Sequence, residues 1–477
     1  MNLADPIDEA IARVPSRIAL VVDEDEVTFA ALGDAIDRAS SALVTAGVVP
    51  GDRVPLVASS GLLATVTVLA CARIGAAAAP MSARATANEI EVMARTAGCG
   101  DVAVAEREIA DRVLEATGLT PLGEAILDRG DQSPRRPDVT DDDVCIVLFT
   151  SGTTGVPKPV PFSHGILGGR VRAFAAPPDP DAPTLVSISC VPFHHVAGLV
   201  GVFVGLAGGN TVVLQRRFDA RAWLALAEKR RVQRVFLVPT MLHRIIDNPD
   251  AARTDLSAVQ LVTYGAAPAT PELIARARTF MPGAVFMQVF GQTETLGGVV
   301  ALGPGDEAAA EKGSVGKAMA GVEVRVVDPA TGEDVPDGEV GEFWVRAPYT
   351  ATEGWVRSGD LVRRDSDGYL YAAGRLSDLI NRGGEKIDPV EVEAVLRSHP
   401  AIEDAAVCGV PDAEMGERVG AVIVARGSLD DGAIRAWCRE RLAPYKVPER
   451  IAFVGALPLT ELGKVSGLRL RSLLQKA

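Results

Sequence analysis

The residues best suited to bind a phosphate group form one short run in the middle of the chain, Thr150-Ser151-Gly152-Thr153-Thr154-Gly155-Val156-Pro157-Lys158. Four hydroxyl groups, two glycines and a lysine stand together in this run. Glycine allows the backbone to approach a ligand, hydroxyl and backbone N–H groups donate hydrogen bonds, and lysine supplies a positive charge. Because a polyanionic phosphate needs all of these, the run predicts a phosphate-binding loop.

The neighbouring residues exclude the P-loop, in which a helix begins at the lysine. Pro157 precedes Lys158 and Pro159 follows it, and proline lacks the backbone N–H that a helix interior requires. The apolar, β-branched residues 144–149 predict a buried strand just before the loop. We therefore expect the loop to leave the end of a strand. For such a run taken alone, a flexible polar surface turn is the alternative interpretation.

Two further segments carry side chains that suit a bound nucleotide. Residues 290–294, Phe-Gly-Gln-Thr-Glu, offer an aromatic ring that can stack on adenine, a hydroxyl for a phosphate, and a carboxylate for Mg²⁺. Residues 365–368, Asp-Ser-Asp-Gly, predict a hairpin turn that returns Arg375 toward Asp360. One carboxylate and one guanidinium could then meet the same ligand, although an ordinary surface ion pair explains them equally well.

Composition indicates a large enzyme of the cytoplasm. With 477 residues, 48% of them hydrophobic, the chain can bury more than one core. Its net charge of −14 argues against nucleic acid and anionic membranes as partners. The six cysteines have no paired spacing, which is typical of reduced core residues. Residues 1–10 lack the apolar core of a signal peptide, and glycines interrupt the apolar residues 196–214 before they reach the length of a membrane-spanning helix.

Predicted helices and strands alternate in the first part of the chain, and the pattern changes after Arg375. Residues 29–46 and 62–74 have helical spacing, and residues 53–58 between them predict a strand, as in a mainly parallel α/β sheet. Such sheets bind ligands at the carboxyl ends of their strands, where the predicted phosphate loop lies. After Arg375, a helix start at Asp388-Pro389 and several short strands predict a small α+β unit. The predicted fold is a large α/β N-terminal domain, with parallel sheets and a small β subdomain, and a small α+β C-terminal domain.

Taken in this order, the segments resemble the motifs of the adenylate-forming superfamily, which includes acyl-CoA synthetases, aryl-acid adenylating enzymes, peptide-synthetase adenylation domains and beetle luciferases. Residues 150–158 are similar to its phosphate loop, with Pro159 where the family usually has glycine. Residues 290–294 resemble its Tyr-Gly-x-Thr-Glu motif, and residues 457–464 resemble its final motif. The resemblance covers essentially the whole chain and is closest to stand-alone acyl-CoA synthetases.

The resemblance implies a nucleotide site built from many short segments. Lys464 would stabilise the charge that develops as a carboxylate attacks the α-phosphate, Thr293 would bind the phosphate, and Glu294 would hold Mg²⁺. Asp360 would accept both ribose hydroxyls. The remaining residues implied to bind ATP or AMP are Thr150, Ser151, Gly152, Thr153, Thr154, Lys158, Gly265, Ala266, Ala267, Phe290, Gly291 and Arg375.

The same resemblance describes the acid pocket. His195 matches a histidine or aromatic residue that closes the carboxylate pocket, and it is the third catalytic candidate; a histidine pair at a helix start is the alternative. Its segment lacks the aspartate of amino-acid-activating domains, which disfavours an amino-acid substrate. Malonyl-CoA synthetases use an arginine near position 244 together with a second one that is Val289 here, so a dicarboxylate is disfavoured and Arg244 is expected to be a surface or structural residue. We expect an apolar or aromatic acid larger than acetate. The pocket residues implied are His195, Val196, Gly265, Val289, Leu296 and Gly297.

The implied activity is a two-step ligation. ATP and the acid give an acyl-adenylate and pyrophosphate, and the thiol of CoA then displaces AMP. Residues 1–375 would bind ATP and the carboxylate, and residues 376–477 would form a mobile domain with its hinge at Ser377, where the family more often has Asp or Lys. Gly383 and Gly384 would line the approach of the thiol.

Two alternatives to this activity stay open. The first is an adenylating enzyme that loads the phosphopantetheine of a carrier protein, and the second is a catalytically silent nucleotide-binding homologue. The presence of Lys158, Glu294, Asp360, Arg375 and Lys464 together argues against a silent homologue.

Overall fold

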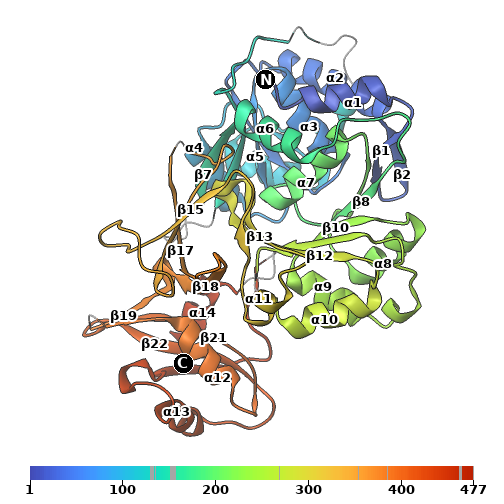
Figure 1. Cartoon of the computed structure of the whole chain (residues 1–477). Coiled ribbons are helices and arrows are strands. Elements are labelled where there is room, and N and C mark those ends of the chain that lie inside the picture. Colours follow the sequence, from blue (N-terminus) through green and yellow to red (C-terminus); the bar gives the residue numbers. More distant parts are fainter. Residues whose placement is uncertain are drawn as a thin grey trace. The chain divides into compact units, whose positions relative to one another are not determined.

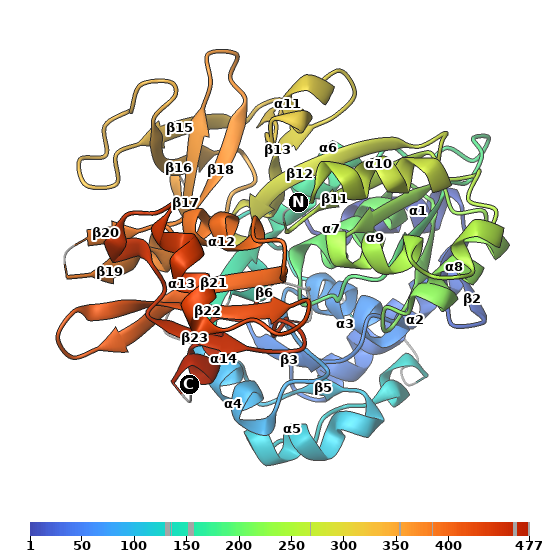
Figure 2. The ribbon, with the colours of Figure 1, turned by 90° about the horizontal axis from the view of Figure 1, so that it is seen from below.

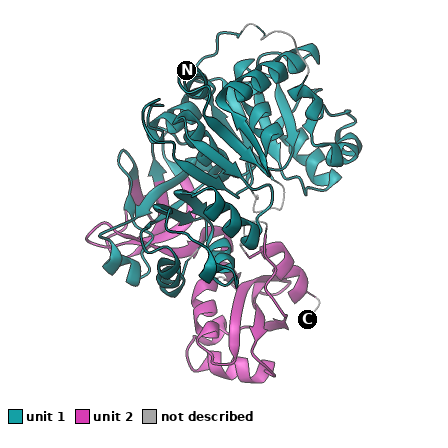
Figure 3. Cartoon of the chain, turned by 90° about the vertical axis from the view of Figure 1, so that its right-hand side faces the viewer, with its two compact units in different colours: residues 1–323, 345–356 teal, residues 324–344, 357–477 magenta. Residues whose placement is uncertain are grey.

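The computed structural model describes residues 1–128, 134, 136–150, 157–267, 269–352, 354–383, 385–460 and 465–475. The chain forms two compact units, residues 1–323 with 345–356 and residues 324–344 with 357–477 (Figure 3). The sequence instead predicts a division after residue 375, between a large domain and a small domain that moves relative to it. Units defined by contacts do not test that movement, so the division stays a prediction.

Two largely parallel sheets form the frame of the first unit (Figure 1). The larger has nine strands in the order β14-β13-β12-β11-β10-β8-β9-β1-β2, and antiparallel pairs occur only toward its two ends. Its strands are β1 (Ile18–Val22), β2 (Asp25–Thr28), β8 (Val186–Ser189), β9 (Thr211–Leu214), β10 (Arg234–Leu237), β11 (Leu261–Gly265), β12 (Val285–Gln292), β13 (Gly297–Leu302) and β14 (Lys317–Ala318).

The smaller sheet has five strands in the order β5-β3-β4-β6-β7, of which only β6 and β7 pair antiparallel. They are β3 (Arg53–Val57), β4 (Ala77–Met81), β5 (Val104–Ala105), β6 (Val144–Thr150) and β7 (Lys158–Ser163). The predicted parallel α/β class is confirmed. So is the buried strand before the phosphate loop, since residues 145–148 of β6 are fully buried.

Helices cover these sheets. Thr28 caps α2 by accepting a hydrogen bond from the N–H of Ala31, and Ser163 caps α6 by accepting one from Ile166. The helices are α1 (Asp5–Arg13), α2 (Phe29–Thr45), α3 (Leu62–Arg73), α4 (Ala87–Ala97), α5 (Ala110–Thr117), α6 (His164–Phe174), α7 (Val196–Ala207), α8 (Ala220–Lys229), α9 (Pro239–Ile246), α10 (Pro271–Phe280) and α11 (Glu307–Glu311). Figure 2 shows α2 beside α3, and their apolar faces share one core with α7.

The second unit holds most of a four-stranded sheet and all of a second five-stranded sheet. The four-stranded sheet has the order β15 (Glu323–Val327), β16 (Val340–Arg346), β17 (Val356–Arg364) and β18 (Leu370–Arg375). The other consists of β19 (Ile380–Arg382), β20 (Glu385–Ile387), β21 (Ile402–Asp412), β22 (Gly416–Ala425) and β23 (Arg450–Phe453), with helices α12 (Pro389–Arg397), α13 (Asp431–Arg439) and α14 (Gly467–Leu474). Asp388 caps α12 and Pro389 is its first residue, so the predicted helix start is confirmed.

The cysteines and the long apolar stretch match their predicted roles. All six cysteines are free thiols, and five of them are buried. The apolar residues 196–214 form α7 and β9 rather than one long helix. Within the described ranges, no helix combines the length and hydropathy that crossing a membrane requires.

Candidate active site

The two ends of the predicted phosphate loop lie side by side. Thr150 is the last residue of β6, Lys158 is the first residue of β7, and the two residues pair across these antiparallel strands. The Lys158 side chain is exposed, and the segment continues as a strand, so no helix begins at this lysine. Ser151, Gly152, Thr153 and Thr154 lie outside the described residues. β6 also contacts the short helix η4 (Thr293–Thr295), which contains Glu294.

Strands β11, β12 and β13 bring together the predicted adenine and acid residues. Gly265 pairs with Val289, and Gly291 pairs with Gly298. A Cβ atom on Gly265 would lie 2.2 Å from the carbonyl oxygen of Val289, and one on Gly291 would lie 2.0 Å from that of Gly297. Both distances are far inside contact, so these strands can approach so closely only because positions 265 and 291 are glycine.

Strained backbone occurs in the turn after β11 and in the turn before β13. Among the described residues, four other than glycine have positive φ, and two of them are Ala266 (φ 66°) and Leu296 (φ 50°). Ala266 directly follows β11, and the side chain of Leu296 is fully buried in the core. Left-handed backbone is costly for a residue with a side chain and is concentrated at functional sites. The strain therefore supports the assignment of both turns to a ligand site.

A network of local hydrogen bonds fixes the backbone around Glu294. The hydroxyl of the fully buried Thr295 accepts a hydrogen bond from the N–H of Gln292 at 3.0 Å and donates one to the carbonyl of Gly297 at 2.7 Å. The N–H of Ala351 donates to the carbonyl of Glu294 at 2.8 Å. The half-buried carboxylate of Glu294 thus stands on a fixed turn.

Arg170 on α6 links three parts of this region. Its guanidinium donates a hydrogen bond of 2.7 Å to the carbonyl of Gly298 and lies 4.0 Å from the ring centre of Tyr349 and 4.2 Å from that of Phe174. Only 6% of Arg170 is exposed, and burial lowers the pKa of its side chain below the ordinary arginine value. Neither Arg170 nor Thr295 was found from the sequence. An arginine in a mostly apolar helix was the one available signal.

His195 stands at the start of α7. Its carbonyl accepts the N–H of Leu199 at 3.1 Å, and its ring lies 4.3 Å from that of His194. Val196 is the first residue of α7, and this helix packs against β13, which begins at Gly297. His195 and Val196 are therefore on an element that contacts the predicted pocket strands. Arg244 is exposed on α9, as expected for a surface residue.

Asp360 and Arg375 meet in the second unit. β17 and β18 form an antiparallel hairpin in which Asp360 pairs with Arg375, so the predicted hairpin is confirmed. The Arg375 Nε donates a hydrogen bond of 2.6 Å to the Asp360 carboxylate. Asp365 closes the turn by accepting hydrogen bonds from Asp367 and Tyr369.

The remaining predicted positions lie after this hairpin. Ser377 is exposed in the short helix η5 (Leu376–Asp378), where its hydroxyl contacts the Asp378 carboxylate at 3.0 Å. Gly383 has φ 60° and an exposed backbone. Gly384 and Lys464 lie outside the described residues.

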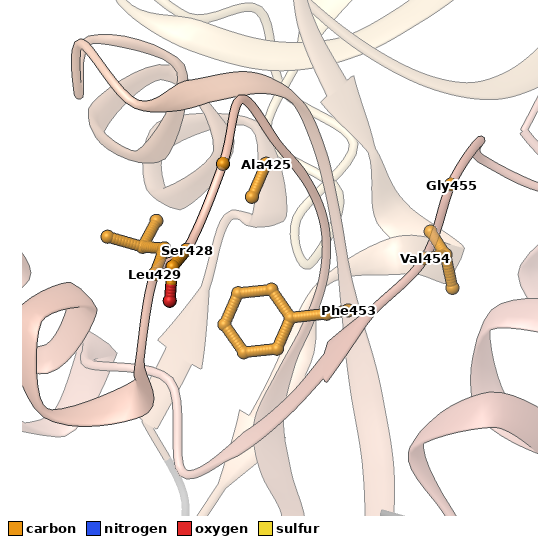
Figure 4. A pocket seen from close by; sticks show the side chains of 7 residues that line it. Ala425, Ser428, Leu429, Phe453, Val454 and Gly455 are labelled. Carbon is orange, nitrogen blue, oxygen red and sulfur yellow. The ribbon is translucent and has the colours of Figure 1, made fainter.

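A shallow hollow of about 360 Å³ lies elsewhere in the second unit, between the end of β22 and β23 (Figure 4). In Figure 4 the ring of Phe453 lies beside the segment of Ser428 and Leu429. None of the lining residues belongs to the predicted site, and we assign no role to the hollow.

The described residues test whether a metal ion fits. They contain no group of three or more His, Cys, Asp and Glu side chains that could hold an ion by themselves. Mg²⁺ does not require such a group, because it is commonly bound by one or two carboxylates together with substrate phosphates. Glu294, on the helix η4 that β6 contacts, would supply one carboxylate of that kind.

Comparison with known proteins agrees with this geometry. Residues 7–355 match the AMP-binding enzyme family, and residues 391–464 match the AMP-binding enzyme C-terminal domain. A feruloyl-CoA synthase of Amycolatopsis sp. is 37% identical over 460 residues, covering 92% of each chain. An indoleacetate–CoA ligase of Aromatoleum aromaticum is 32% identical, covering 98% of this chain and 96% of the relative.

Solved structures give the same result. The o-succinylbenzoate CoA synthetase of Bacillus subtilis, in complex with its acyl-adenylate intermediate, superposes with a TM-score of 0.84 at 26% identity, covering 99% of this chain and 98% of that one. The amide bond synthetase McbA of Marinactinospora thermotolerans superposes with a TM-score of 0.83 at 30% identity, covering 98% and 99%.

The fold and the family match together define the class: the chain belongs to the AMP-binding enzyme family. Within it, the chain is an acid–thiol ligase, an ATP-dependent carboxylate–CoA ligase that acts through an acyl-adenylate and forms AMP. The predicted resemblance, fold class and type of enzyme are confirmed.

Proposed function

We propose that this ligase activates carboxylic acids that carry an aromatic ring and transfers the acyl group to CoA. The two relatives above are named for ferulate and indoleacetate, and a third, 31% identical, is a 4-coumarate–CoA ligase-like protein of Oryza sativa. All three named acids have an aromatic ring separated from the carboxylate by a short chain. An acid of this shape is the class that we assign to the present chain.

The observation that carries this proposal is the chemistry of the pocket strands. β11, β12 and β13 contain no charged residue. The side chain of Val289 lies between two glycines: Cβ atoms on Gly265 and Gly298 would lie 3.1 Å and 2.8 Å from it. No atom of the described residues lies within 4 Å of the position that a Cβ on Gly297 would occupy. An uncharged wall with open space beside it suits a flat aromatic group, and the three strands themselves carry no cation for a second carboxylate.

The proposed chemistry divides between the site residues. The acid's carboxylate oxygen attacks the α-phosphorus of ATP and pyrophosphate leaves, with Lys464 and Thr293 stabilising the developing charge. Mg²⁺, held by Glu294 and the phosphates, would neutralise part of the phosphate charge. His195 would close the carboxylate pocket, and the other predicted nucleotide residues would position ATP. The CoA thiol then attacks the acyl carbonyl, and AMP leaves together with the electron pair of the broken C–O bond.

One specific observation points to a second possible acceptor of the acyl group beside CoA. McbA, which is named an amide bond synthetase, matches almost the whole chain at 30% identity. An amine therefore belongs in any test of the second step beside CoA, and a holo carrier protein is the third acceptor to include. CoA stays the acceptor of this ligase, as in the relatives with the higher identities, and the other two acceptors test whether it has a second one. We also propose that the chain works in the cytoplasm, where its free cysteines would stay reduced.

A panel of acids scored for pyrophosphate release tests the proposal. The panel comprises ferulate, 4-coumarate, indoleacetate, octanoate, acetate and malonate, each with ATP and Mg²⁺. We expect at least one aryl acid to exceed acetate and malonate by about 100-fold in kcat/KM, which corresponds to about 2.7 kcal/mol of differential transition-state binding. A clear preference for octanoate, acetate or malonate would overturn the aromatic assignment.

A further inference from the structure

The turn that contains Gly383 is fixed by a second hairpin of the same domain. The N–H of Gly383 donates a hydrogen bond of 2.8 Å to the carbonyl of Met415, in the turn between β21 and β22. Just before it, Arg382 pairs with Gly416. Two turns that are far apart in the sequence therefore lie against each other, and the position of one determines the position of the other.

Side-chain packing makes this contact tight. A Cβ atom on Gly383 would lie 2.6 Å from the terminal methyl group of Met415, and the φ of Gly383 is 60°. The positive φ favours glycine at this position, whereas the Met415 methyl group ends a flexible side chain and could move aside for a larger residue. The backbone hydrogen bond couples the two positions, because a shift of the Met415 carbonyl would move the Gly383 N–H that donates to it.

Four charged side chains connect these two turns to β23. The carboxylate of Asp412 accepts hydrogen bonds from the N–H of Met415 at 3.0 Å and from the Nε of Arg418 at 2.6 Å. Arg418 also donates to Glu449, just before β23, and the other oxygen of Glu449 accepts the Nε of Arg382 at 2.6 Å. The network runs from the Met415 turn to Arg382, next to Gly383.

The network is sheltered enough to hold its geometry. Its four side chains are only 20–27% exposed. The hydrogen bond from Arg418 lowers the pKa of Asp412 to about 2, and the hydrogen bonds from Arg382 and Arg418 outweigh burial to keep the pKa of Glu449 below its ordinary value. All four groups are charged at neutral pH, and linked, partly buried charges hold one another more firmly than isolated surface pairs.

We propose that Asp412, Arg418, Glu449 and Arg382 act as positioning residues for the second half-reaction, because they hold the Gly383 turn where the thiol must pass. The inference rests on the proposed function, in which this turn lines the approach of CoA. None of the four residues needs to touch the reacting atoms. Their effect is on the rate of thioester formation and not on adenylation, for which the same domain supplies Lys464.

The test compares Glu449→Gln with Glu391→Gln. Both substitutions remove one carboxylate charge from the same domain. Glu391 pairs with Lys446 at 2.6 Å, and within the described part of the chain it does not belong to the network around Gly383. Each half-reaction is measured on the full chain, with the acid that releases most pyrophosphate in the panel and with CoA. We expect Glu449→Gln to keep ATP–pyrophosphate exchange within about 2-fold and to slow transfer from preformed acyl-adenylate to CoA by about 10-fold. Glu391→Gln should change neither rate by more than about 2-fold.

Failure of the positioning role and failure of the proposed function give different results. If the unmodified enzyme forms no thioester with CoA, the proposed function fails. If it does, and Glu449→Gln transfers at the unmodified rate, or loses both half-reactions equally, the positioning role is wrong. If Glu449→Gln does not fold, Arg382→Lys replaces it: this variant keeps the positive charge but not the Nε hydrogen bond, and the same split between half-reactions is expected.

Discussion

Asp360 and Arg375 face each other across the β17–β18 hairpin, with 2.6 Å between a carboxylate oxygen and Nε. The two side chains differ in exposure, since 11% of the Asp360 side chain is accessible against 49% of that of Arg375. The arginine therefore orients a sheltered carboxylate while about half of its own side chain stays exposed. Such a pair suits the binding of ribose hydroxyls better than it suits stability, because surface ion pairs contribute little.

Asp360→Asn tests this role. The variant keeps the shape of the side chain but removes its charge and one acceptor oxygen, so we expect KM for ATP in pyrophosphate exchange to rise at least ~10-fold, or about 1.4 kcal/mol. Asp337→Asn is the matched control, because Asp337 pairs with Arg364 at 2.8 Å in the same unit and has no predicted ligand. Equal KM values for the two variants would contradict the assignment.

Lys464→Ala should separate the two half-reactions. The lysine is assigned to adenylate formation only, so acid-dependent ATP–pyrophosphate exchange should fall by at least ~100-fold while supplied acyl-adenylate is still converted to thioester. Lys446→Ala, which removes a lysine paired with Glu391 on the same domain, controls for the loss of charge. An equal loss of both activities in Lys464→Ala would refute the role.

Ser377→Pro tests the proposed hinge. A small domain that supplies Lys464 for one step and the Gly383 turn for the other must rotate between steps, and proline fixes φ near −65° and removes an N–H. We expect adenylation to survive and thioester formation to fall at least ~10-fold, about 1.4 kcal/mol of barrier, whereas Ser377→Ala keeps both rates. Quenched-flow measurement of each half-reaction decides. Unchanged rates in the proline variant would place the pivot elsewhere.

Acid should destabilise the first unit through His164. This residue is fully buried, its Nδ1 accepts a hydrogen bond from the N–H of Leu3 at 3.0 Å, and burial lowers its pKa, although Asp143 opposes this. Because the folded pKa lies below the unfolded value of about 6.5, the unfolded chain binds the proton more readily. The stability that the neutral ring provides is present above about pH 6.5 and is lost as the pH falls below that value.

Denaturant unfolding at about pH 7.5 and about pH 5.5 measures this effect. We expect the free energy of unfolding to fall less between these pH values in His164→Gln than in the unmodified chain, because glutamine can accept the same N–H without titrating. The same fall in both proteins would show that His164 is not responsible.

The sequence predicted elements whose signals are local. The helix expected over residues 29–46 is α2 (Phe29–Thr45), because apolar spacing and the Thr28 cap lie within one segment. Residues 258–263 also predict a strand from the sequence, but that strand, β11, begins at Leu261. Its start depends on pairing with β10, and the preceding residues form a turn closed by the N–H of Val259 and the carbonyl of Leu256.

The site residues show the same difference between local and long-range signals. Motif residues such as Asp360 and Arg375 could be paired from one hairpin turn, because only a few residues separate their strands. Arg170 could not be found, since its partner Gly298 lies 128 residues away and the contact exists only once α6 and β13 are packed. The Asp412–Glu449 network likewise depends on which turns meet.

A single-turnover reaction of the purified chain with ferulate, ATP, Mg²⁺ and CoA, followed by the mass of each product, tests whether the chain makes an aryl-CoA thioester through an acyl-adenylate. We predict AMP, pyrophosphate and a CoA thioester in equal amounts, with the acyl-adenylate accumulating when CoA is left out. Formation of the adenylate without any CoA thioester, while an amine or a holo carrier protein is acylated, would contradict it.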